Sequence, residues 1–361
     1  MRRAPIGIVC AASTWIALAG PARGQQETTL QMNVYGDITY GVEHDEGQTA
    51  NTFAVPTFDV FSRGQLGKLS LISEIVFDVP EGNEFQVDVD RAVLSYEFRE
   101  WFQLSAGRFH TALGYFNTAY PQGAAIYILS VDRPVTVSQF EEQALLPPLG
   151  VGLRASGRIH AGNQAFTYDA EVLNGHGPTS AEVVDRQDYN NAKAFNLRLR
   201  YEPGFLPGLI VGGNGYVDWI PPSPVDPTTM LSPQPLTLRE QIFGAHVAYV
   251  EYPVHLILEG FSIQHLAPGG PTFTTWASFI EAGYALGLVT PYFRAELVDF
   301  PAAPDPFYAL TGQQARGNLR ELSFGGKWSP TTSFALKLEL EWDHAQTDTA
   351  LRATMQAAFG F

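Results

Sequence analysis

Apolar and polar residues alternate with a period of two over most of the chain from Leu30 onward. Between residues 334 and 342, for example, the even positions carry large apolar side chains and the odd positions carry mainly charged ones. Successive side chains of a β-strand point to opposite faces, so each such segment predicts a strand with one apolar and one polar face. A soluble sandwich also contains strands of this kind, and only the number and spacing of the repeats separate the two architectures.

Sixteen segments carry this alternation, and most reach the length of about 9–11 residues that a tilted strand needs to cross the hydrocarbon of a membrane. They cover residues 30–44, 55–66, 68–79, 84–99, 101–109, 148–160, 164–174, 192–203, 207–220, 238–250, 253–266, 272–286, 288–300, 317–328, 332–344 and 349–361. The alternation changes phase within 84–99, and either a β-bulge near Asp90 and Arg91 or a strand end covered by a loop would explain the change.

The connections between these segments alternate between short and long, in step with the order of the strands. The short set comprises residues 67, 99–100, 161–163, 203–207, 251–252, 287 and 329–331. The opposite set comprises 45–54, 110–147, 175–191, 221–237 and 301–316, with brief members near 80–83, 267–271 and 345–348. A soluble β-protein has no reason for this rhythm, whereas tight turns at one membrane surface produce it. We therefore expect an all-β fold, a transmembrane antiparallel up-and-down β-barrel of about sixteen strands.

The polar face of these strands is strongly charged, and it predicts an interior filled with water. Burying so many charges without water would cost roughly several kcal/mol each. The charged residues assigned to this face are Asp37, Asp59, Arg63, Glu74, Arg154, Arg158, Asp169, Glu171, Arg198, Arg200, Glu259, Glu281, Arg294 and Glu321.

The N-terminus has the pattern of a secretory signal peptide. Arg2 and Arg3 precede a mostly apolar run over residues 6–18, and small residues then lead to a cleavage site expected after Gly24. A retained membrane anchor is the alternative, but the run is shorter than the roughly 20 residues that a spanning helix needs. We expect a signal peptide over 1–24, a barrel over 25–361, and export to the outer membrane of a Gram-negative cell.

Charge and composition narrow the functions that this barrel could have. Removing residues 1–24 takes away three arginines and no acid, so the net charge moves from −15 to −18. This acidity argues against a nucleic-acid partner, which clustered lysines and arginines would bind. The mature chain has four lysines and no cysteine. Because no catalytic or cofactor-binding motif is present either, we expect neither an enzyme nor a cofactor.

The longest connection, residues 110–147, is rich in apolar residues such as Tyr115, Phe116 and Tyr120. A loop on the open outer surface would not need this content, but a loop packed inside the barrel would. We therefore expect residues 110–147 to fold inward and to narrow the lumen.

Several short motifs around this connection resemble the Gram-negative outer-membrane porin superfamily, and the phosphate-selective porin O and P type in particular. They are the runs 106–109 (AGRF) and 149–153 (LGVGL), together with Gly114 and the pair 133–134 (RP). The resemblance implies a sixteen-stranded barrel, usually trimeric, whose third extracellular loop forms the constriction. Phosphate-selective pores are implied to attract anions with lysines, and lysine is scarce in this chain.

The candidate pore residues form two groups of opposite charge. Inward-facing arginines would make a positive wall, opposite an acidic loop, and the field between them would favour small polar solutes. The pore and constriction candidates are Arg63, Arg91, Asp132, Arg133, Glu141, Glu142, Arg154, Arg158, Arg198 and Arg200.

These expectations favour a passive channel for small hydrophilic solutes or ions, with a weak preference for cations because of the net charge. A scaffold or sheath around a periplasmic partner complex is the alternative. The expected partners are outer-membrane lipid, lipopolysaccharide, small polar solutes and further copies of the chain in a homotrimer. Arg108 is in phase with the apolar face, and three positions are open to it: the outer rim, a pairing with lipopolysaccharide phosphate, or an inward turn where the strand ends. A structural salt bridge is the commonest role of such an arginine. Phe361 ends a strand that resembles the signal read by the outer-membrane assembly machinery.

Overall fold

The computed structural model describes residues 28–45, 48–55, 57–78, 86–120, 124–138, 144–178, 188, 190–222, 237–309, 313–345 and 348–361. The signal peptide expected over residues 1–24 lies outside these residues. The strands are β1 (Thr28–Asp45), β2 (Gln48–Ala54), β3 (Thr57–Leu66), β4 (Leu69–Asp78), β5 (Gln86–Arg99), β6 (Phe102–His110), β7 (Leu149–Ala161), β8 (Gln164–Leu173), β9 (Ala194–Glu202), β10 (Leu209–Ile220), β11 (Leu238–Glu251), β12 (Val254–Leu266), β13 (Thr272–Tyr284), β14 (Val289–Asp299), β15 (Leu319–Thr331), β16 (Phe334–Ala345) and β17 (Asp348–Gly360). The short helices are α1 (Phe116–Ala119), η1 (Ala124–Ile126), η2 (Val135–Val137) and η4 (Gln313–Arg316).

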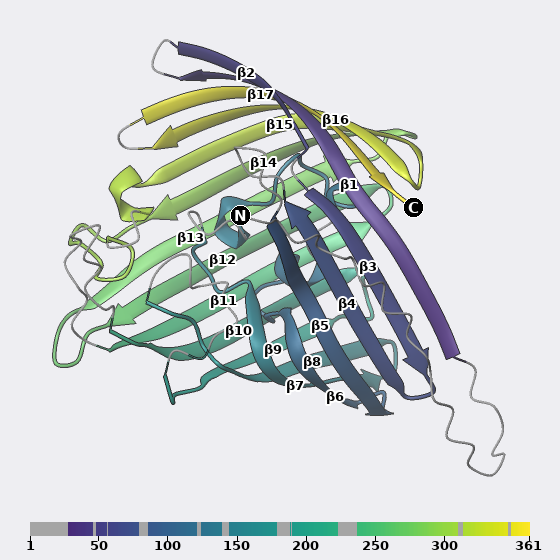
Figure 1. The fold of residues 1–361 in the computed structure, drawn as a ribbon, viewed down its shortest axis with the longest axis vertical. Coiled ribbons are helices and arrows are strands. Elements are labelled where there is room, and N and C mark those ends of the chain that lie inside the picture. The colour runs from purple at the N-terminus through teal and green to yellow at the C-terminus, as the bar shows by residue number, and fades with distance from the viewer. Residues whose placement is uncertain are drawn as a thin grey trace, which may run out of the picture.

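The strands form one closed antiparallel barrel (Figure 1). From β3 onward each strand pairs with the next, and β17 pairs with β1 to close the ring. One edge of β1 pairs with β3 over Thr28–Gly36 and with β2 over Thr39–Asp45. Because β2 and β3 follow each other along this single edge, sixteen strand positions surround the lumen, and the predicted count is confirmed.

The connection expected over residues 45–54 is mostly strand, so that part of the prediction was wrong. β2 occupies Gln48–Ala54 and forms a hairpin on the end of β1. Almost all of its side chains are exposed, so neither face requires apolar residues and the alternation that marks the other strands is missing. Backbone pairing with β1 extends the sheet here, at the upper edge of the barrel in Figure 1, and the ring of Phe53 packs on that of Tyr40 with centroids 4.5 Å apart.

Six of the seven predicted tight turns fall at the junctions between consecutive strands of the barrel. The seventh, 329–331, is the end of β15, and the chain turns at residues 332–333 instead. The phase change in β5 is a β-bulge. Glu74 pairs with Arg91 and the next residue, Ile75, pairs with Val89, which leaves Asp90 as the extra residue. Before the bulge the odd-numbered residues of β5 face outward, and beyond it they face inward. Val93, an odd-numbered residue beyond the bulge, is accordingly buried.

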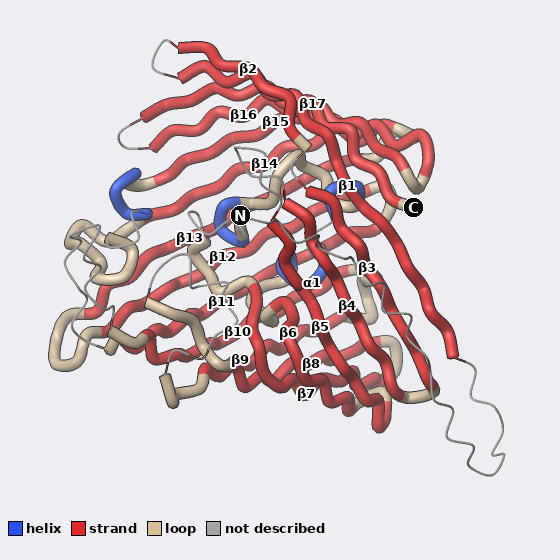
Figure 2. The backbone as a smooth tube through the Cα atoms, viewed as in Figure 1, coloured by secondary structure: helices blue, strands red, loops and turns tan. Residues whose placement is uncertain are grey.

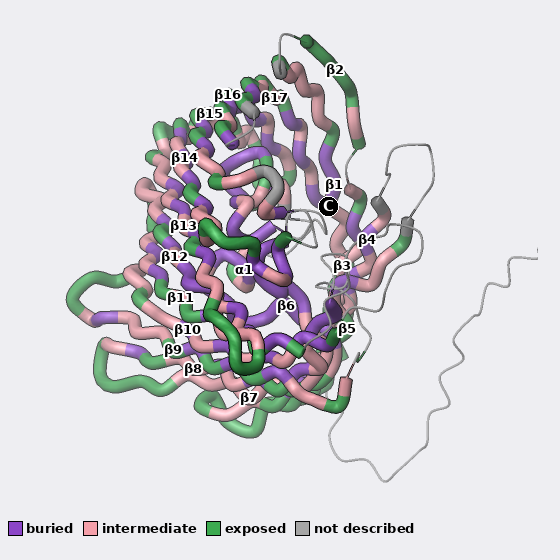
Figure 3. Tube along the Cα trace, turned by 90° about the vertical axis from the view of Figure 1, so that its left-hand side faces the viewer, coloured by how far each residue is buried: buried purple, intermediate pink, exposed green. Residues whose placement is uncertain are grey.

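The two faces of the wall differ as the alternation predicts (Figure 3). On β9, Leu197 and Leu199 are 49% and 57% exposed, whereas Asn196 and Arg198 between and beside them are buried. Most of the charged side chains assigned to the interior are buried among one another, and the outward face is apolar. Among the residues that the structure describes, no helix is long and apolar enough to cross a membrane.

The seam between β1 and β17 closes at the last residue. The backbone N–H of Phe361 donates to the carbonyl of Val34, and the N–H of Val34 donates to the carbonyl of Phe361, both at 2.9 Å. The Phe361 ring is exposed, as are Leu351 and Met355 on the same strand. The terminal ring therefore lies on the apolar outer surface of the barrel.

Candidate functional site

The described residues of the connection 110–147 are hydrogen-bonded to inward-facing side chains of the wall. They contain α1, η1 and η2, and Figure 2 draws helices in blue. Most of these described residues are buried. We call residues 111–120 the proximal stretch and residues 124–138 the distal stretch. The two stretches are held to the wall by different atoms.

In the proximal stretch the backbone N–H groups are bound by acceptor side chains of the wall. Glu259 on β12 accepts from the N–H groups of Tyr115 and Phe116 at 3.1 and 2.5 Å. Glu171 on β8 accepts from the N–H of Ala112 at 3.1 Å, and Asn214 on β10 accepts from Gly114 at 3.1 Å. One cation of the wall also contributes, because Arg198 on β9 donates to the carbonyl of Gly114 at 2.7 Å.

In the distal stretch the backbone carbonyls are bound by cations of the wall. Lys327 on β15 donates to the carbonyls of Ile126 and Ile128. Lys337 on β16 donates to the carbonyl of Ser130 at 2.7 Å, and Arg294 on β14 donates to that of Asp132, also at 2.7 Å. Three acceptors supplement these bonds. Glu339 accepts from the N–H of Val131, Glu296 from that of Thr136, and Glu281 from the hydroxyl of Ser130.

These anchoring side chains are buried although they carry charge. Glu259 and Lys337 are 0% exposed and Arg294 is 1% exposed. A buried charge is tolerated when it is paired and hydrogen-bonded, so the backbone of the connection serves as part of their solvation. Among these anchors, Glu259 and Arg294 were predicted to face the interior but had no predicted role, and Lys327 and Lys337 were not predicted. The alternation places both lysines on the inward face, and this was the signal that could have identified them.

The predicted arginine wall exists, but its guanidinium groups are paired with carboxylates of neighbouring strands. Arg91 on β5 binds Glu74, and Arg154 on β7 binds Glu171. Arg91 also lies 5.1 Å from the ring centroid of Phe61. These pairs run along the wall, so the wall neutralises much of its own positive charge.

The remaining wall arginines are more varied. Arg158 binds Glu202 at a half-exposed position, and Arg63 is exposed on β3. Arg198 is 2% exposed and binds Asp169 through two nitrogens, at 2.7 and 3.0 Å. Arg200 lies 3.6 Å from the same carboxylate.

The candidates on the connection itself divide into those that hold its shape and those that lie outside the described residues. Arg133 donates to the carbonyls of Tyr120 and Val137 and to the side chain of Asn117, so it ties the proximal stretch to the distal one. Asp132 is exposed, and only its carbonyl takes part in the anchoring. Glu141 and Glu142, the acidic residues expected to oppose the arginines, lie outside the described residues.

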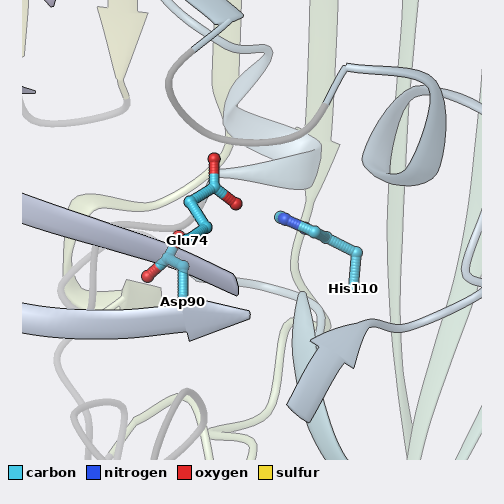
Figure 4. Close-up of side chains that lie close together, drawn as sticks. All are labelled: Glu74, Asp90 and His110. Atoms are coloured by element: carbon cyan, nitrogen blue, oxygen red, sulfur yellow. The ribbon is translucent and has the colours of Figure 1, made fainter. Parts of the chain in front are cut away.

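Two clusters of side chains have the donor types of a metal site. Glu74, Asp90 and His110 converge inside the barrel, with candidate ligand atoms within 4.8 Å of one another (Figure 4). The imidazole of His110 points toward the Glu74 carboxylate in this view. Arg91 already binds that carboxylate and supplies a positive charge, so the ion pair competes directly with a metal ion.

The second cluster lies among the longer connections, where His176 meets Asp218 and Glu240. The two ring nitrogens of His176 lie 2.8 Å from the carbonyl of Gly177 and 3.1 Å from Glu240. Burial opposes a charge on this ring, but the Glu240 carboxylate outweighs it and raises the pKa of His176 to about 9. An imidazole protonated on both nitrogens has no lone pair for a metal.

Glu240 extends this cluster into a chain that reaches another connection. His265 lies 3.3 Å from Glu240 through one nitrogen and 2.9 Å from Asp305 through the other. Asp305 belongs to the connection between β14 and β15, so the chain joins that connection to the one after β8. It is therefore a structural network that fastens the longer connections to the wall.

Arg108 turns away from the outer surface. It is 6% exposed, and its guanidinium lies 3.5 Å from the carboxylate of Asp88 on β5. Of the three positions open to it from sequence, the structure shows the inward turn, and Arg108 forms the expected salt bridge there.

No protein-family model and no curated protein sequence matches the chain. The barrel nevertheless resembles solved outer-membrane proteins. The anion-selective porin from Comamonas acidovorans is 10% identical, with 93% of this chain and 100% of that chain covered and a TM-score of 0.64. The outer-membrane channel DcaP of Acinetobacter baumannii is 11% identical, with coverages of 92% and 97% and a TM-score of 0.59. The trimer form of OmpT, an outer-membrane protein of Vibrio cholerae, is 10% identical, with coverages of 92% and 99% and a TM-score of 0.58.

At this level of identity the likeness concerns the fold alone. The chain has the closed antiparallel barrel fold of outer-membrane porins. Its apolar outer face suits a position in the outer membrane.

Proposed function

We propose that the protein is a passive outer-membrane channel for small hydrophilic solutes or ions. One observation carries the proposal: a closed barrel turns an apolar face outward and a densely charged face inward. Charged residues on an inner wall can interact with a solute that crosses in water, whereas contact with lipid does not account for them. We assign the barrel no catalytic role and no cofactor.

In this proposal residues 110–147 form the constriction. The support is the anchoring of the described part of the connection to the inner faces of β8, β10, β12 and β14 to β16. All of these strands except β8 are separated from the β6–β7 pair, where the connection begins, by at least one other strand. A segment fixed across the interior at so many points reduces the open cross-section and presents its own side chains to the solute.

Selectivity is proposed to come from the charges that border this constriction. The arginines of β5, β7 and β9 lie close to carboxylates, so the local field is that of paired charges of both signs. The expected opposition between these arginines and Glu141 and Glu142 stays a prediction. With a net charge of −18 after removal of the signal peptide, we propose a weak preference for cations.

The finer assignments follow the resemblance stated above. The phosphate-selective type remains a prediction that anion block of the current can test. A homotrimer is proposed because the resemblance implies one and because the similar OmpT of Vibrio cholerae forms a trimer. Cross-linking of the protein in outer-membrane vesicles should then yield a band of three chains, and a band of one chain only would contradict the trimer.

The test of the channel is conductance. Purified full-length protein in planar bilayers should give stepwise currents without any partner, with a reversal potential in a KCl gradient that indicates modest cation preference. Phosphate, neutral sugars and dicarboxylates added in turn should identify the solute class that blocks the current. A folded, inserted barrel that passes no current would contradict the channel and favour the sheath around a periplasmic partner.

A further inference from the structure

A cavity of about 400 Å³ lies between the distal stretch and strands β14 to β17. It lies at the end of the barrel that carries the longer connections, because its lining includes Phe300, Gln313 and Gly317 from the connection between β14 and β15. Its volume falls within the range of about 300–1,000 Å³ that is typical of sites for small molecules.

One side of the cavity is acidic. Glu321, Glu341 and Asp343 line it from β15 and β16, and Asp132 lines it from the distal stretch. These carboxylates come from three separate parts of the chain. The fold, and not a run of acidic sequence, therefore assembles them around one space.

Three guanidinium groups line the same cavity, and two of them pair with its carboxylates. Arg294 binds Glu296 and Glu321, both at 2.8 Å, and also the carbonyl of Asp132. Arg352 binds Glu43 at 2.9 Å, also binds Glu341, and lies 3.9 Å from Asp343.

The third guanidinium, that of Arg133, donates to groups of its own connection. Among the described residues that line the cavity, four carboxylates stand against three guanidiniums. The local excess charge is therefore negative.

The opposite side of the cavity is apolar. The side chains that provide this surface are Val135, Leu145, Val298, Phe300, Leu319 and Ala345. Solvent reaches the cavity near Arg352, which is 41% exposed. A ligand can therefore enter from the aqueous side and meet an acidic surface and an apolar surface together.

We propose that this cavity is a binding site for a small organic cation that has an apolar body, such as an aromatic or aliphatic amine. The ammonium group would approach Glu341 and Asp343, and the apolar body would pack against Leu319 and Val298. An anion would meet the carboxylates, and a small hydrated cation would leave the apolar surface unused. The inference extends the proposed channel by naming a class of solute that the barrel retains before passage.

Equilibrium binding tests this site without relying on conductance. Isothermal titration calorimetry of the full-length protein in detergent should show saturable binding of phenethylammonium. Phenylacetate, which has the same ring and the opposite charge, should not bind. Methylammonium, which lacks the apolar body, should bind with an affinity lower by a factor of about ten or more. Absence of phenethylammonium binding, or equal binding of phenylacetate, would overturn the proposal.

Variants locate the binding within the barrel. Glu341→Gln and, independently, Asp343→Asn should each weaken phenethylammonium binding about tenfold, because each removes a charged acceptor. Leu319→Ala should weaken phenethylammonium about fivefold and leave methylammonium unchanged. The matched control is Glu97→Gln, an exposed carboxylate at the far end of β5, which should bind as the unmodified protein does. Equal weakening by Glu97→Gln would refute the location.

The same preparations separate this inference from the channel. Stepwise currents without phenethylammonium binding would leave the channel standing and remove the cavity as a site. Binding without currents would support the site and contradict the channel.

Discussion

The proximal and distal stretches of the connection 110–147 are held by opposite kinds of chemistry. In the proximal stretch, wall acceptors such as Glu259 bind backbone N–H groups. In the distal stretch, wall cations such as Lys337 bind backbone carbonyls. Most bonds from the proximal stretch to the wall therefore use its N–H groups, and most of those from the distal stretch use its carbonyls.

This difference shows how a long irregular segment can be fixed inside a charged barrel. A helix or strand satisfies its own backbone groups, but an irregular segment leaves both kinds unpaired, and buried peptide groups need partners. The wall supplies anions where N–H groups point outward and cations where carbonyls do. Because the bonds go to the backbone, many side chains of the segment remain free to vary.

The largest effect is expected at Arg294, which anchors the distal stretch. Arg294→Met leaves Glu296 and Glu321 buried without their cation and should lower the free energy of unfolding by about 3–5 kcal/mol. Urea titration of the protein in lipid vesicles measures the change. The control is Arg320→Met, which removes an exposed pair with Asp299 and should cost about 0–1 kcal/mol. Equal losses in both variants would mean that burial of the pair is irrelevant.

A smaller effect is expected at Glu259, the main anchor of the proximal stretch. Glu259→Leu leaves the N–H groups of Tyr115 and Phe116 without an acceptor and should cost about 2–4 kcal/mol. Open-channel current noise should increase as the stretch becomes mobile. Glu259→Gln keeps an acceptor oxygen and should restore a quiet current. If Gln behaves like Leu, the charge of Glu259 matters and the hydrogen bonds do not.

Lys327 should have a milder effect, because it is only partly buried. Lys327→Met removes the donor to two carbonyls of the distal stretch and should cost about 1–2 kcal/mol in the urea titration. Lys193→Met, at an exposed pair with Asp188, should stay within about 0.5 kcal/mol of the unmodified protein. A Lys327 variant as stable as the control would show that the distal carbonyls need no cation.

The smallest effect on either stretch should come from His176, which fastens a different connection. Its folded pKa of about 9 lies above the ordinary 6.5, so its stabilisation is complete below pH 6.5 and is lost as the pH rises through 9. The free energy of unfolding should fall by roughly 1 kcal/mol between pH 7 and 9.5, which should lower the thermal midpoint by about 2–4 °C. His176→Gln should reduce that fall, the remainder coming from His265 beside the same Glu240 carboxylate, and should leave the conductance unaltered. A fall of equal size in this variant would assign it to other groups.

The barrel could be predicted from the sequence because its strands repeat a local pattern. The alternation within each strand identifies its inward and outward faces, and the bulge at Asp90 was visible as a change of phase. β2 escaped detection because both of its faces are exposed, so its side chains carry no alternation. Its position depends on backbone pairing with β1, which no residue type encodes.

The anchors of the connection could be predicted only in part. Inward parity placed Glu259 and Arg294 on the correct face, but the partner of each is a backbone group in a segment more than 140 residues away in sequence. The path of an irregular segment determines those pairs, and that path has no periodic signal. The predicted roles of Arg133 and Arg198 as pore residues likewise omitted their bonds to the connection.

The seam at Phe361 also constrains the order in which the protein can be made. Residues 35–45 of β1 pair with β17, which follows all the other strands of the barrel along the chain, so β1 keeps an open edge until β17 is in place. Until then this edge offers unpaired peptide groups to any other strand. β16 cannot take the place of β17 without breaking the antiparallel order, because it runs parallel to β1. Closure of the ring therefore depends on β17, and the open edge must be kept from other chains until β17 has paired.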